Sequence, residues 1–353
     1  MRIGLVLGAG GVVGGSWLIG ALEALESETG WSPSEADVIV GTSAGSVVGA
    51  LTAQGLSPAL MAAYVGGGSL EEVEDLVDQA DLTATRMNES TFRPQLALPP
   101  IGPGSWRMAV STLLRPRAHT PAAVLSGWLP RGFISTKPIT ELVERFVPDA
   151  WPDHDNFWAV TCDYRTGRRE VFGREGAPEA RAGEAVAASC AIPGFYHPVE
   201  IGGRRYVDGG VCSVSNVDLL CDQELDLVVC LNPMSSLANV TPRSAGDRVA
   251  AVMRKQAGRR LGAEAKKLRE RGTDVLLLQP TADDLALMGP NLMARDRREA
   301  VIERAIRTTA RQLRRARTRE GVVVPKRTRR ATPAAAAQRR RRAAAAAAAR
   351  TAA

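Results

Sequence analysis

Histidine is scarce in this chain of 353 residues, which contains only His119, His154 and His197. The five cysteines form no Cys-x-x-Cys pair, their number is odd, and no histidine cluster lies near them. Structural metal sites and disulfide frameworks need such pairs and clusters, so this pattern argues against both. We therefore expect a protein of a reducing compartment, with no metal and no other cofactor.

Charged residues are missing from residues 3–22, which raises the question of a leader peptide or a membrane span. Seven of these twenty residues are glycine, and that density does not suit the apolar helix that both would need. We expect a cytoplasmic protein that contacts the inner membrane surface peripherally at most.

Acidic residues are missing from Lys326 onward, where nine Lys or Arg residues occur. The formal charge of the chain is +7, so the rest of the chain carries −2. The basic character thus belongs to an Ala/Arg-rich tail, residues 321–353, which we expect to be disordered. Such a tail is normally solvated. Near an anionic membrane each cation contributes about 1 kcal/mol, whereas nucleic acid is the less favoured partner.

Apolar runs and helical patterns alternate along residues 1–320, which predicts an α/β domain with parallel strands and right-handed crossovers. We expect strands at 3–7, 38–40, 157–163, 170–172, 199–201, 205–207, 226–231 and 274–279. We expect helices at 16–29, 44–54, 182–191, 243–271 and 296–317, and one that opens at Ser57-Pro58. Residues 82–131 contain seven prolines and interrupt the pattern. We interpret them as a variable lid or acyl-chain cap, or as an ordinary helical insertion.

A Gly-x-Ser-x-Gly motif at residues 41–45 lies between a predicted strand and a predicted helix. On such a turn the serine hydroxyl is exposed, and Gly41 and Gly45 remove side chains that would collide. The amide groups at the start of the helix, Ala44 included, favour negative charge at the serine oxygen. Ser43 is therefore the candidate nucleophile.

A serine needs a base to accept its proton. In α/β-hydrolases the serine comes late in the sheet and is followed by an acid and then a histidine. Here only one strand precedes the one that carries Ser43, and His197 comes before Asp208, so a histidine triad fits poorly. Asp208 is the better candidate base, since Gly209 and Gly210 let the chain turn sharply behind it. The alternative is a turn residue at a strand end.

The glycine-rich loop of residues 8–15 follows the first strand and opens a helix. A dinucleotide-binding loop has this context, but Val13 stands where its third glycine belongs and no acid ends the second strand. The alternative function of such a loop is an oxyanion hole, in which backbone amides such as those of Gly10 and Gly11 donate to the developing negative charge. Adjacent parallel strands would place this loop beside Ser43.

Four blocks follow one another in the chain: residues 7–14, 41–45, 187–199 and 206–210. Together they resemble the blocks of the patatin-like phospholipase family, over about residues 1–320. The resemblance implies a three-layer α/β/α sandwich with a mainly parallel sheet, and hydrolysis of lipid acyl esters through an acyl-enzyme without a metal. One departure is Val13, where the family commonly has Arg or Lys.

By the matching motif positions, the resemblance implies that Ser43 is the nucleophile and Asp208 the proton acceptor of a Ser–Asp dyad. The oxyanion or substrate-binding residues are then Gly8, Gly10, Gly11 and Ala44, supported by Gly41, Gly45, Gly209 and Gly210. The alternative is a catalytically weak, membrane-recruited lipid-binding protein that works through the basic tail.

Overall fold

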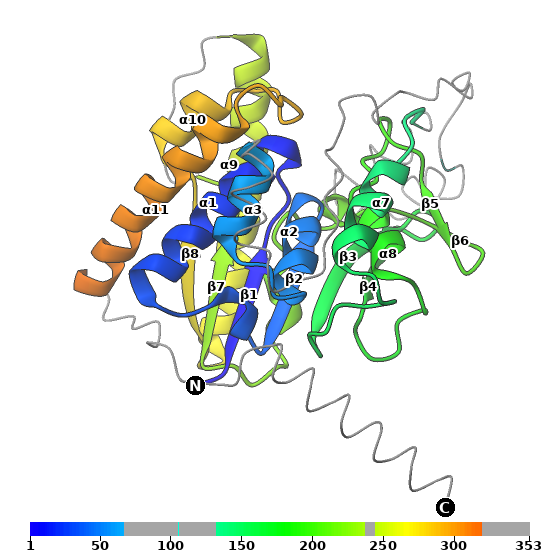
Figure 1. Cartoon of the computed structure of the whole chain (residues 1–353), viewed down its shortest axis with the longest axis horizontal. Helices are drawn as coiled ribbons and strands as arrows, with labels where there is room; N and C mark the ends of the chain where they lie inside the picture. Colours follow the sequence, from blue (N-terminus) through cyan, green and yellow to red (C-terminus); the bar gives the residue numbers. More distant parts are fainter. Residues whose placement is uncertain (67–104, 106–131, 237–243, 320–353) are drawn as a thin grey trace, which may run out of the picture.

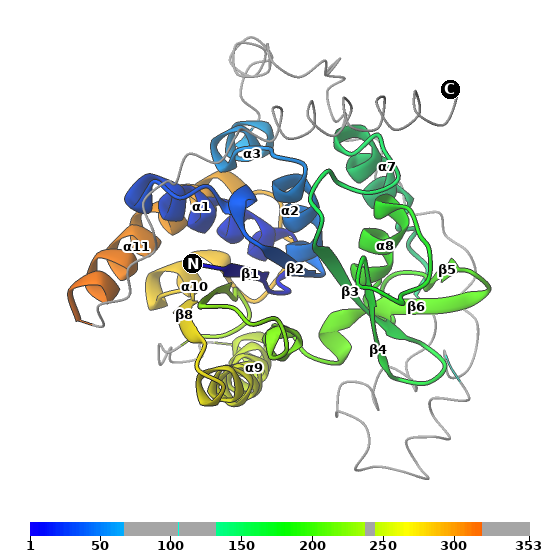
Figure 2. The same cartoon turned by 90° about the horizontal axis from the view of Figure 1, so that it is seen from below.

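The computed structural model describes residues 1–66, 105, 132–236 and 244–319. Apart from Ser105, the expected lid at 82–131 lies outside these residues, as does the tail at 321–353. The prediction of an α/β/α sandwich is confirmed: helices cover both faces of one central sheet (Figures 1 and 2).

Eight strands form the sheet, in the order β5-β6-β3-β2-β1-β7-β8, with β4 paired to β3. They are β1 (Ile3–Leu7), β2 (Val38–Thr42), β3 (Phe157–Asp163), β4 (Arg169–Phe172), β5 (Val199–Ile201), β6 (Arg204–Asp208), β7 (Leu227–Leu231) and β8 (Asp274–Leu278). β3, β2, β1, β7 and β8 are parallel, whereas β4, β6 and β5 pair antiparallel. The antiparallel edge follows from hairpins, which join neighbouring strands by short turns.

Side chains of the strands alternate between two cores, as the pleat requires. Leu5 and Leu7 of β1 pack with Trp17, whereas Val6 belongs to a second cluster with Leu261. The first core lies under α1 (Gly11–Thr29), α2 (Ala44–Ala53), α3 (Pro58–Gly66), α7 (Lys137–Phe146), α8 (Ala182–Ser189), α10 (Ala282–Met288) and α11 (Arg298–Arg319). The second lies under α9 (Ala245–Glu270) (Figure 2).

The start of α1 differs from the sequence prediction. The pattern predicts a helix from Ser16, but α1 already begins at Gly11, so the second half of the glycine-rich loop is helical. Glycine is a poor helix former, and tertiary packing overrides that preference here. A Cβ added at Gly14 would lie 3.2 Å from the Pro233 ring, and one at Gly15 would lie 3.7 Å from the Ala44 Cβ. Small residues thus let α1 approach its neighbours closely.

α1 also packs closely against α11, and Gly20 lies at their contact. A Cβ added there would be 2.4 Å from the Ile302 carbonyl oxygen and 2.9 Å from the Ala305 Cβ. Because the first atom belongs to the backbone, a side chain at this position could fit only if the two helices moved apart. The last helix, α11, is therefore part of the same packed unit as the first helix.

We expect Gly20→Ala to lower the free energy of unfolding by about 1–3 kcal/mol, because overpacking separates α1 from α11. The measurement is urea unfolding followed by circular dichroism. The matched control is Gly262→Ala in α9, where an added Cβ would meet nothing within 4 Å. That change should raise stability by about 0.5–1 kcal/mol through helix propensity alone. Equal stability of Gly20→Ala and wild type would contradict the packing described.

Candidate active site

Ser43 lies on the sharp turn between β2 and α2, at the carboxyl end of the central strands. Its backbone has φ 55° and ψ −125°, a conformation that side chains rarely adopt. Holding a residue there costs about 1–3 kcal/mol, so the surroundings must enforce it. The Ser43 carbonyl accepts hydrogen bonds from the Ser46 hydroxyl at 2.7 Å and the Ser46 amide at 2.8 Å. These bonds close the first turn of α2 around the serine.

Gly41 and Gly45 are required by close backbone approach. A Cβ at Gly45 would lie 2.0 Å from the Leu7 carbonyl oxygen, and one at Gly41 would lie 2.5 Å from the Gly45 carbonyl oxygen. Neither neighbour can move without displacing β1 or α2. The two glycines therefore have the role that the sequence predicts for them.

Ser189, at the end of α8, is a residue of the site that sequence reasoning missed. Its Oγ accepts a hydrogen bond from the Ser43 amide at 2.9 Å and donates one to the Val160 carbonyl at 2.6 Å. This fully buried hydroxyl thereby ties the turn to β3. The motif at residues 187–199 marks the position, but nothing in it shows that the bond reaches across 146 residues.

Asp208 reaches Ser43 through the sheet. β6 pairs with β3 and β3 with β2, so the carboxyl end of β6 lies two strands from the turn. The Ser43 hydroxyl lies close enough to the Asp208 carboxyl to lower its pKa. The Gly210 amide donates a hydrogen bond to Asp208 Oδ1 at 2.7 Å. A Cβ at Gly209 would lie 2.3 Å from the Val160 carbonyl oxygen, so glycine is needed here too.

The Asp208 carboxyl is buried, and burial has the largest influence on its acidity. It raises the pKa of Asp208 from 3.8 to about 6, because a charged carboxylate loses its hydration there. The Ser43 hydroxyl and the Gly210 amide lower the pKa, but by less. Asp208 is consequently a stronger base than an ordinary aspartate and is still ionised at neutral pH.

The glycine-rich loop lies against the same site. Ala9 approaches Gly210, since a Cβ there would be 3.7 Å from the Ala9 Cβ. The first turn of α1 meets the first residue of α2 through Gly15 and Ala44. The amides of Gly10, Gly11 and Ala44 find no acceptor within the described parts of the chain. Two helix amino ends, with their positive dipole ends, thus meet beside Ser43.

The position of the Gly8 amide differs from the donor or substrate-binding role that the sequence predicts for this residue. Its amide donates to the Leu231 carbonyl at 2.9 Å, and the Ala9 amide donates to the Val214 carbonyl at 2.8 Å. Both are therefore engaged in holding the loop and cannot serve as donors to a ligand. Gly8 is needed for space instead, because a Cβ would lie 2.9 Å from Asn232 Oδ1.

A polar network behind the turn was not predicted either. The buried Asn216 donates to the Thr42 hydroxyl at 2.9 Å and accepts from the Arg169 guanidinium at 2.9 Å. Arg169 in turn pairs with both oxygens of Asp218, at 2.7 and 2.9 Å. Paired in this way, a buried polar group fixes geometry without the cost of an unsatisfied donor. The network fixes the residue that precedes Ser43.

The histidines do not join this site in the part of the chain that the structure describes. His154 contacts the Ala36 carbonyl at 2.6 Å, at the opposite end of β2. No hydrogen bond joins the His197 ring to Ser43 or Asp208 in residues 1–66 and 132–236, and His119 lies outside the described residues. Within the described ranges no cluster of three His, Cys, Asp or Glu side chains is arranged to hold a metal. Every helix in those ranges is too short or too polar to span a bilayer.

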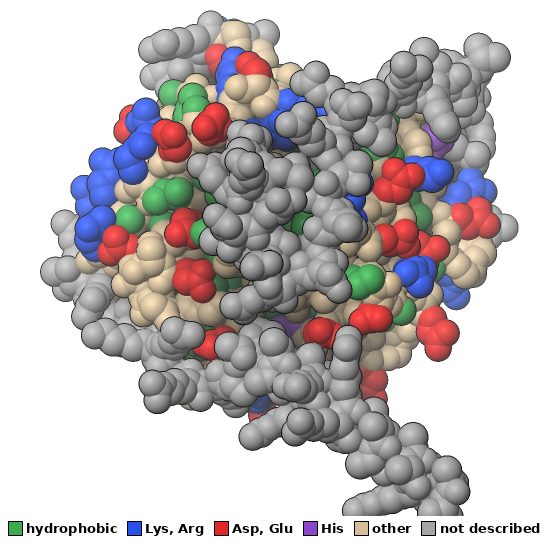
Figure 3. All heavy atoms as spheres, in the orientation of Figure 1, with side chains coloured by type: hydrophobic (Ala, Val, Ile, Leu, Met, Phe, Trp, Pro, Cys, Tyr) green, Lys and Arg blue, Asp and Glu red, His purple; other side chains and the backbone are tan. Residues whose placement is uncertain are grey.

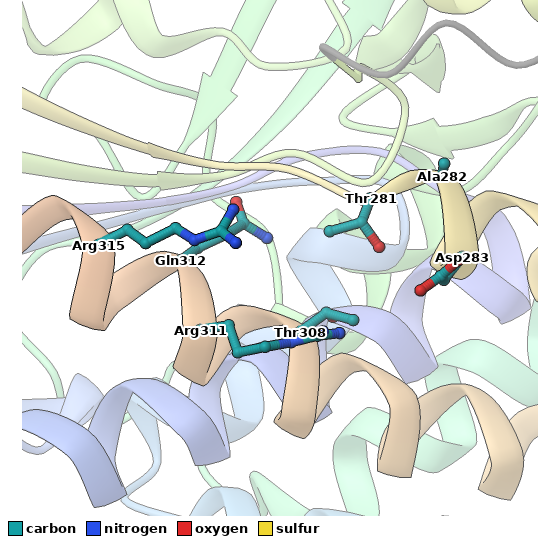
Figure 4. Close-up of a pocket in the computed structure, with 7 residues that line it drawn as sticks. All are labelled: Thr281, Ala282, Asp283, Thr308, Arg311, Gln312 and Arg315. Atoms are coloured by element: carbon teal, nitrogen blue, oxygen red, sulfur yellow. The ribbon is translucent and has the colours of Figure 1, made fainter.

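A cavity of about 190 Å³ lies elsewhere, between α10 and α11 (Figure 4). Arg311, Gln312 and Arg315 of α11 face Thr281 and Asp283 at the start of α10. The lining of this cavity includes two arginines and one aspartate but no serine next to a base. Its lining includes none of the residues around Ser43.

Ser43 on its strand–helix turn and the buried Asp208 thus lie together at one end of the α/β sheet. Residues 5–220 match the family model described as patatin-like phospholipase. The chain belongs to this family, whose members are lipid hydrolases. The matched region contains Ser43, Asp208 and the glycine-rich loop.

Two solved structures are similar to this chain. One is the type III effector protein ExoU, with 17% identity and a TM-score of 0.35, covering 89% of this chain and 53% of that one. The other is the ExoU–SpcU heterodimeric complex from the type III secretion system of Pseudomonas aeruginosa, with 18% identity and a TM-score of 0.30, covering 90% and 60%. The chain thus spans little more than half the length of these proteins. The assignment rests on the family model.

Asp208→Asn should raise stability near neutral pH, by up to about 3 kcal/mol, because it removes a buried charge. Below pH about 4 the carboxyl is protonated in both the folded and the unfolded chain, so the two proteins should be equally stable. Between about 4 and 6 only the unfolded chain ionises, and the wild type loses stability as the pH rises. Urea unfolding across this range is the measurement. A variant that is less stable than wild type above pH about 7 would contradict a raised pKa.

Proposed function

We propose that this protein hydrolyses carboxylic esters of lipids, phospholipids among them, with Ser43 as the nucleophile and Asp208 as the base. The observation that carries the proposal is the buried Asp208 carboxyl beside the strained Ser43, with a pKa that burial raises to about 6 and that the Ser43 hydroxyl partly lowers. A base with a pKa closer to the working pH combines ionisation with a stronger pull on the proton. No histidine is required for this step.

The reaction begins when Asp208 accepts the proton of the Ser43 hydroxyl. The serine oxygen then attacks the ester carbonyl carbon, and the carbonyl oxygen becomes an oxyanion. The amides of Gly10, Gly11 and Ala44 donate hydrogen bonds to that oxyanion, each worth about 10²–10³ in rate. Both helix dipoles are present before the charge forms, so little reorganisation is needed.

The tetrahedral intermediate collapses when the ester C–O bond breaks, and the leaving alcohol takes the proton from Asp208. The acyl group remains on Ser43 as an ester. Water then attacks this acyl-enzyme with Asp208 again accepting a proton, and Ser43 recovers that proton as the fatty acid leaves. The cycle uses the chain's own residues at each step and returns Asp208 to its ionised form.

The alternative function is a catalytically weak lipid-binding protein that depends on the basic tail. It gives no reason for a strained serine, a hydrogen-bonded buried base and three amides without acceptors to meet at one place. Each of these features carries a cost in stability that a binding protein would not need. The hydrolase is therefore the better proposal.

The test of the nucleophile is labelling by a fluorophosphonate probe, which reacts with activated serines. We expect wild type to be labelled and Ser43→Ala not to be. Asp208→Asn should label at least about 100-fold more slowly, since general-base catalysis contributes about 10²–10⁴-fold. If the folded wild-type protein reacts neither with the probe nor with any acyl ester tried, the proposal is wrong.

The pH dependence of kcat/KM for a water-soluble ester tests the base. Asp208 must be ionised to accept the proton, so activity should rise with pH, reach half its maximum at about 6 and stay level above. The matched control is Asp163→Asn, because that buried aspartate accepts amide hydrogen bonds from Arg165 and Thr166 in a turn. It should retain the wild-type profile. An acid limb near the ordinary aspartate pKa would argue against a desolvated base.

A further inference from the structure

Two adjacent apolar side chains of α9 are exposed to water. Val252 is 57% exposed and Met253 is 54% exposed. Apart from Met1, they are the only large hydrophobic side chains with such exposure in the described part of the chain. A pair at one place differs from the scattered single apolar residues that every surface has.

Cations surround this pair. Arg248, Lys255 and Arg259 are exposed, and with Val252 they follow the three- and four-residue spacing that aligns side chains on one helix face. The first half of α9 contains one acid, Asp247, whose carboxylate accepts the Ser244 amide at 3.0 Å. We call Arg248, Val252, Met253, Lys255 and Arg259 the α9 surface. Apolar residues flanked by cations are typical of helices that lie in the interface of an anionic membrane.

The α9 surface begins at the same end of the sheet as the candidate active site. A Cβ at Gly246 would lie 3.7 Å from the Pro290 Cβ, and Arg254 donates to the Gly289 carbonyl at 3.3 Å. The same segment reaches the glycine-rich loop, because the Leu292 carbonyl accepts the Val13 amide at 3.1 Å. In Figure 1 the first turns of α9 project at the top, the end towards which β1 runs from the N-terminus.

We propose that the α9 surface docks this protein on anionic lipid bilayers. The cations would attract the surface charge of the bilayer, and Val252 and Met253 would enter the boundary between head groups and acyl chains. This proposal rests on the proposed function for its purpose, since docking here holds the ester-hydrolysing site next to its substrate. It does not depend on the chemistry of Ser43.

A second cationic surface lies on α11, where arginine side chains gather along one edge of the molecule (Figure 3). Its arginines are partly neutralised: Arg314 pairs with Glu28 at 3.1 Å and Arg307 with Glu303 at 3.6 Å. No large apolar side chain is exposed among the described side chains of α11. Charge alone could attract an anionic surface there, but nothing would anchor it. α11 therefore provides the matched control.

The test is co-sedimentation of the full chain with phosphatidylcholine vesicles made with and without phosphatidylglycerol. Every protein carries Ser43→Ala, so that no lipid is consumed. Against this parent, Arg248→Gln/Lys255→Gln/Arg259→Gln should lower the partition coefficient on anionic vesicles on the order of 100-fold, about fivefold per cation. Val252→Ser/Met253→Ser should lower it about tenfold or more, because two apolar side chains no longer enter the bilayer.

The control Arg307→Gln/Arg311→Gln/Arg315→Gln removes the same number of cations from α11. It should change binding by less than about twofold, since charges beyond a Debye length of the bilayer are screened. Equal losses in the α9 and α11 variants would overturn the proposal. So would wild-type binding by both α9 variants, or binding that depends on residues 326–353 alone. Thermal unfolding shows whether each variant is folded.

Hydrolysis of a water-soluble ester, measured with Ser43 restored, separates the two proposals. The α9 variants should keep wild-type kcat/KM on the soluble ester and lose activity only on anionic vesicles. A wild-type protein that binds vesicles through α9 but cleaves no ester would refute the proposed function and leave the docking surface intact. A protein that cleaves the soluble ester, but in which both α9 variants bind vesicles as well as the parent, would refute the docking surface and leave the proposed function intact.

Discussion

The positive φ of Ser43 is the constraint on which the rest of the site depends. It marks the sharp turn at which β2 ends and α2 begins, so the amino end of α2 lies beside the serine. Such a conformation persists only where the surroundings over-determine it. Here Gly41 and Gly45 do so from within the turn, and the Ser189 hydroxyl does so from a distant segment of the chain. The strained turn can therefore exist only within the folded structure that surrounds it.

The buried Asp208 carboxyl shows how stability and the proposed chemistry oppose one another in this molecule. Desolvation that makes Asp208 a better base also makes its ionised form costly for the fold. A histidine would carry less of that penalty, since its neutral form is the base. The Gly210 amide instead donates a hydrogen bond to the carboxylate, and the Ser43 hydroxyl also favours its charged form. The carboxylate is enclosed at the end of an antiparallel strand.

Local sequence patterns predicted the parts of the structure that local physics determines. The bounds of the first strand and of the strand at Phe157–Asp163 match the pattern, because short apolar runs between turns have few alternatives. The motifs predict close backbone approaches at Gly41, Gly45 and Gly209, and an added Cβ would collide with backbone at each of them. The roles of Ser43 and Asp208 stay predictions from the same motifs. The start of α1, the engaged amide of Gly8 and the Ser189 and Asn216 bonds were not predictable. They depend on segments that meet only after the sheet has formed.

The central claim is that acyl groups pass through Ser43 with no histidine involved, and mass spectrometry of the protein quenched during turnover tests it most directly. The account predicts an acyl group on the peptide that contains Ser43, formed in a burst before steady state. The acyl group should be absent in Ser43→Ala and present in the triple variant His119→Gln/His154→Gln/His197→Gln. Turnover that persists in Ser43→Ala, or an acyl group on any other residue, would contradict it.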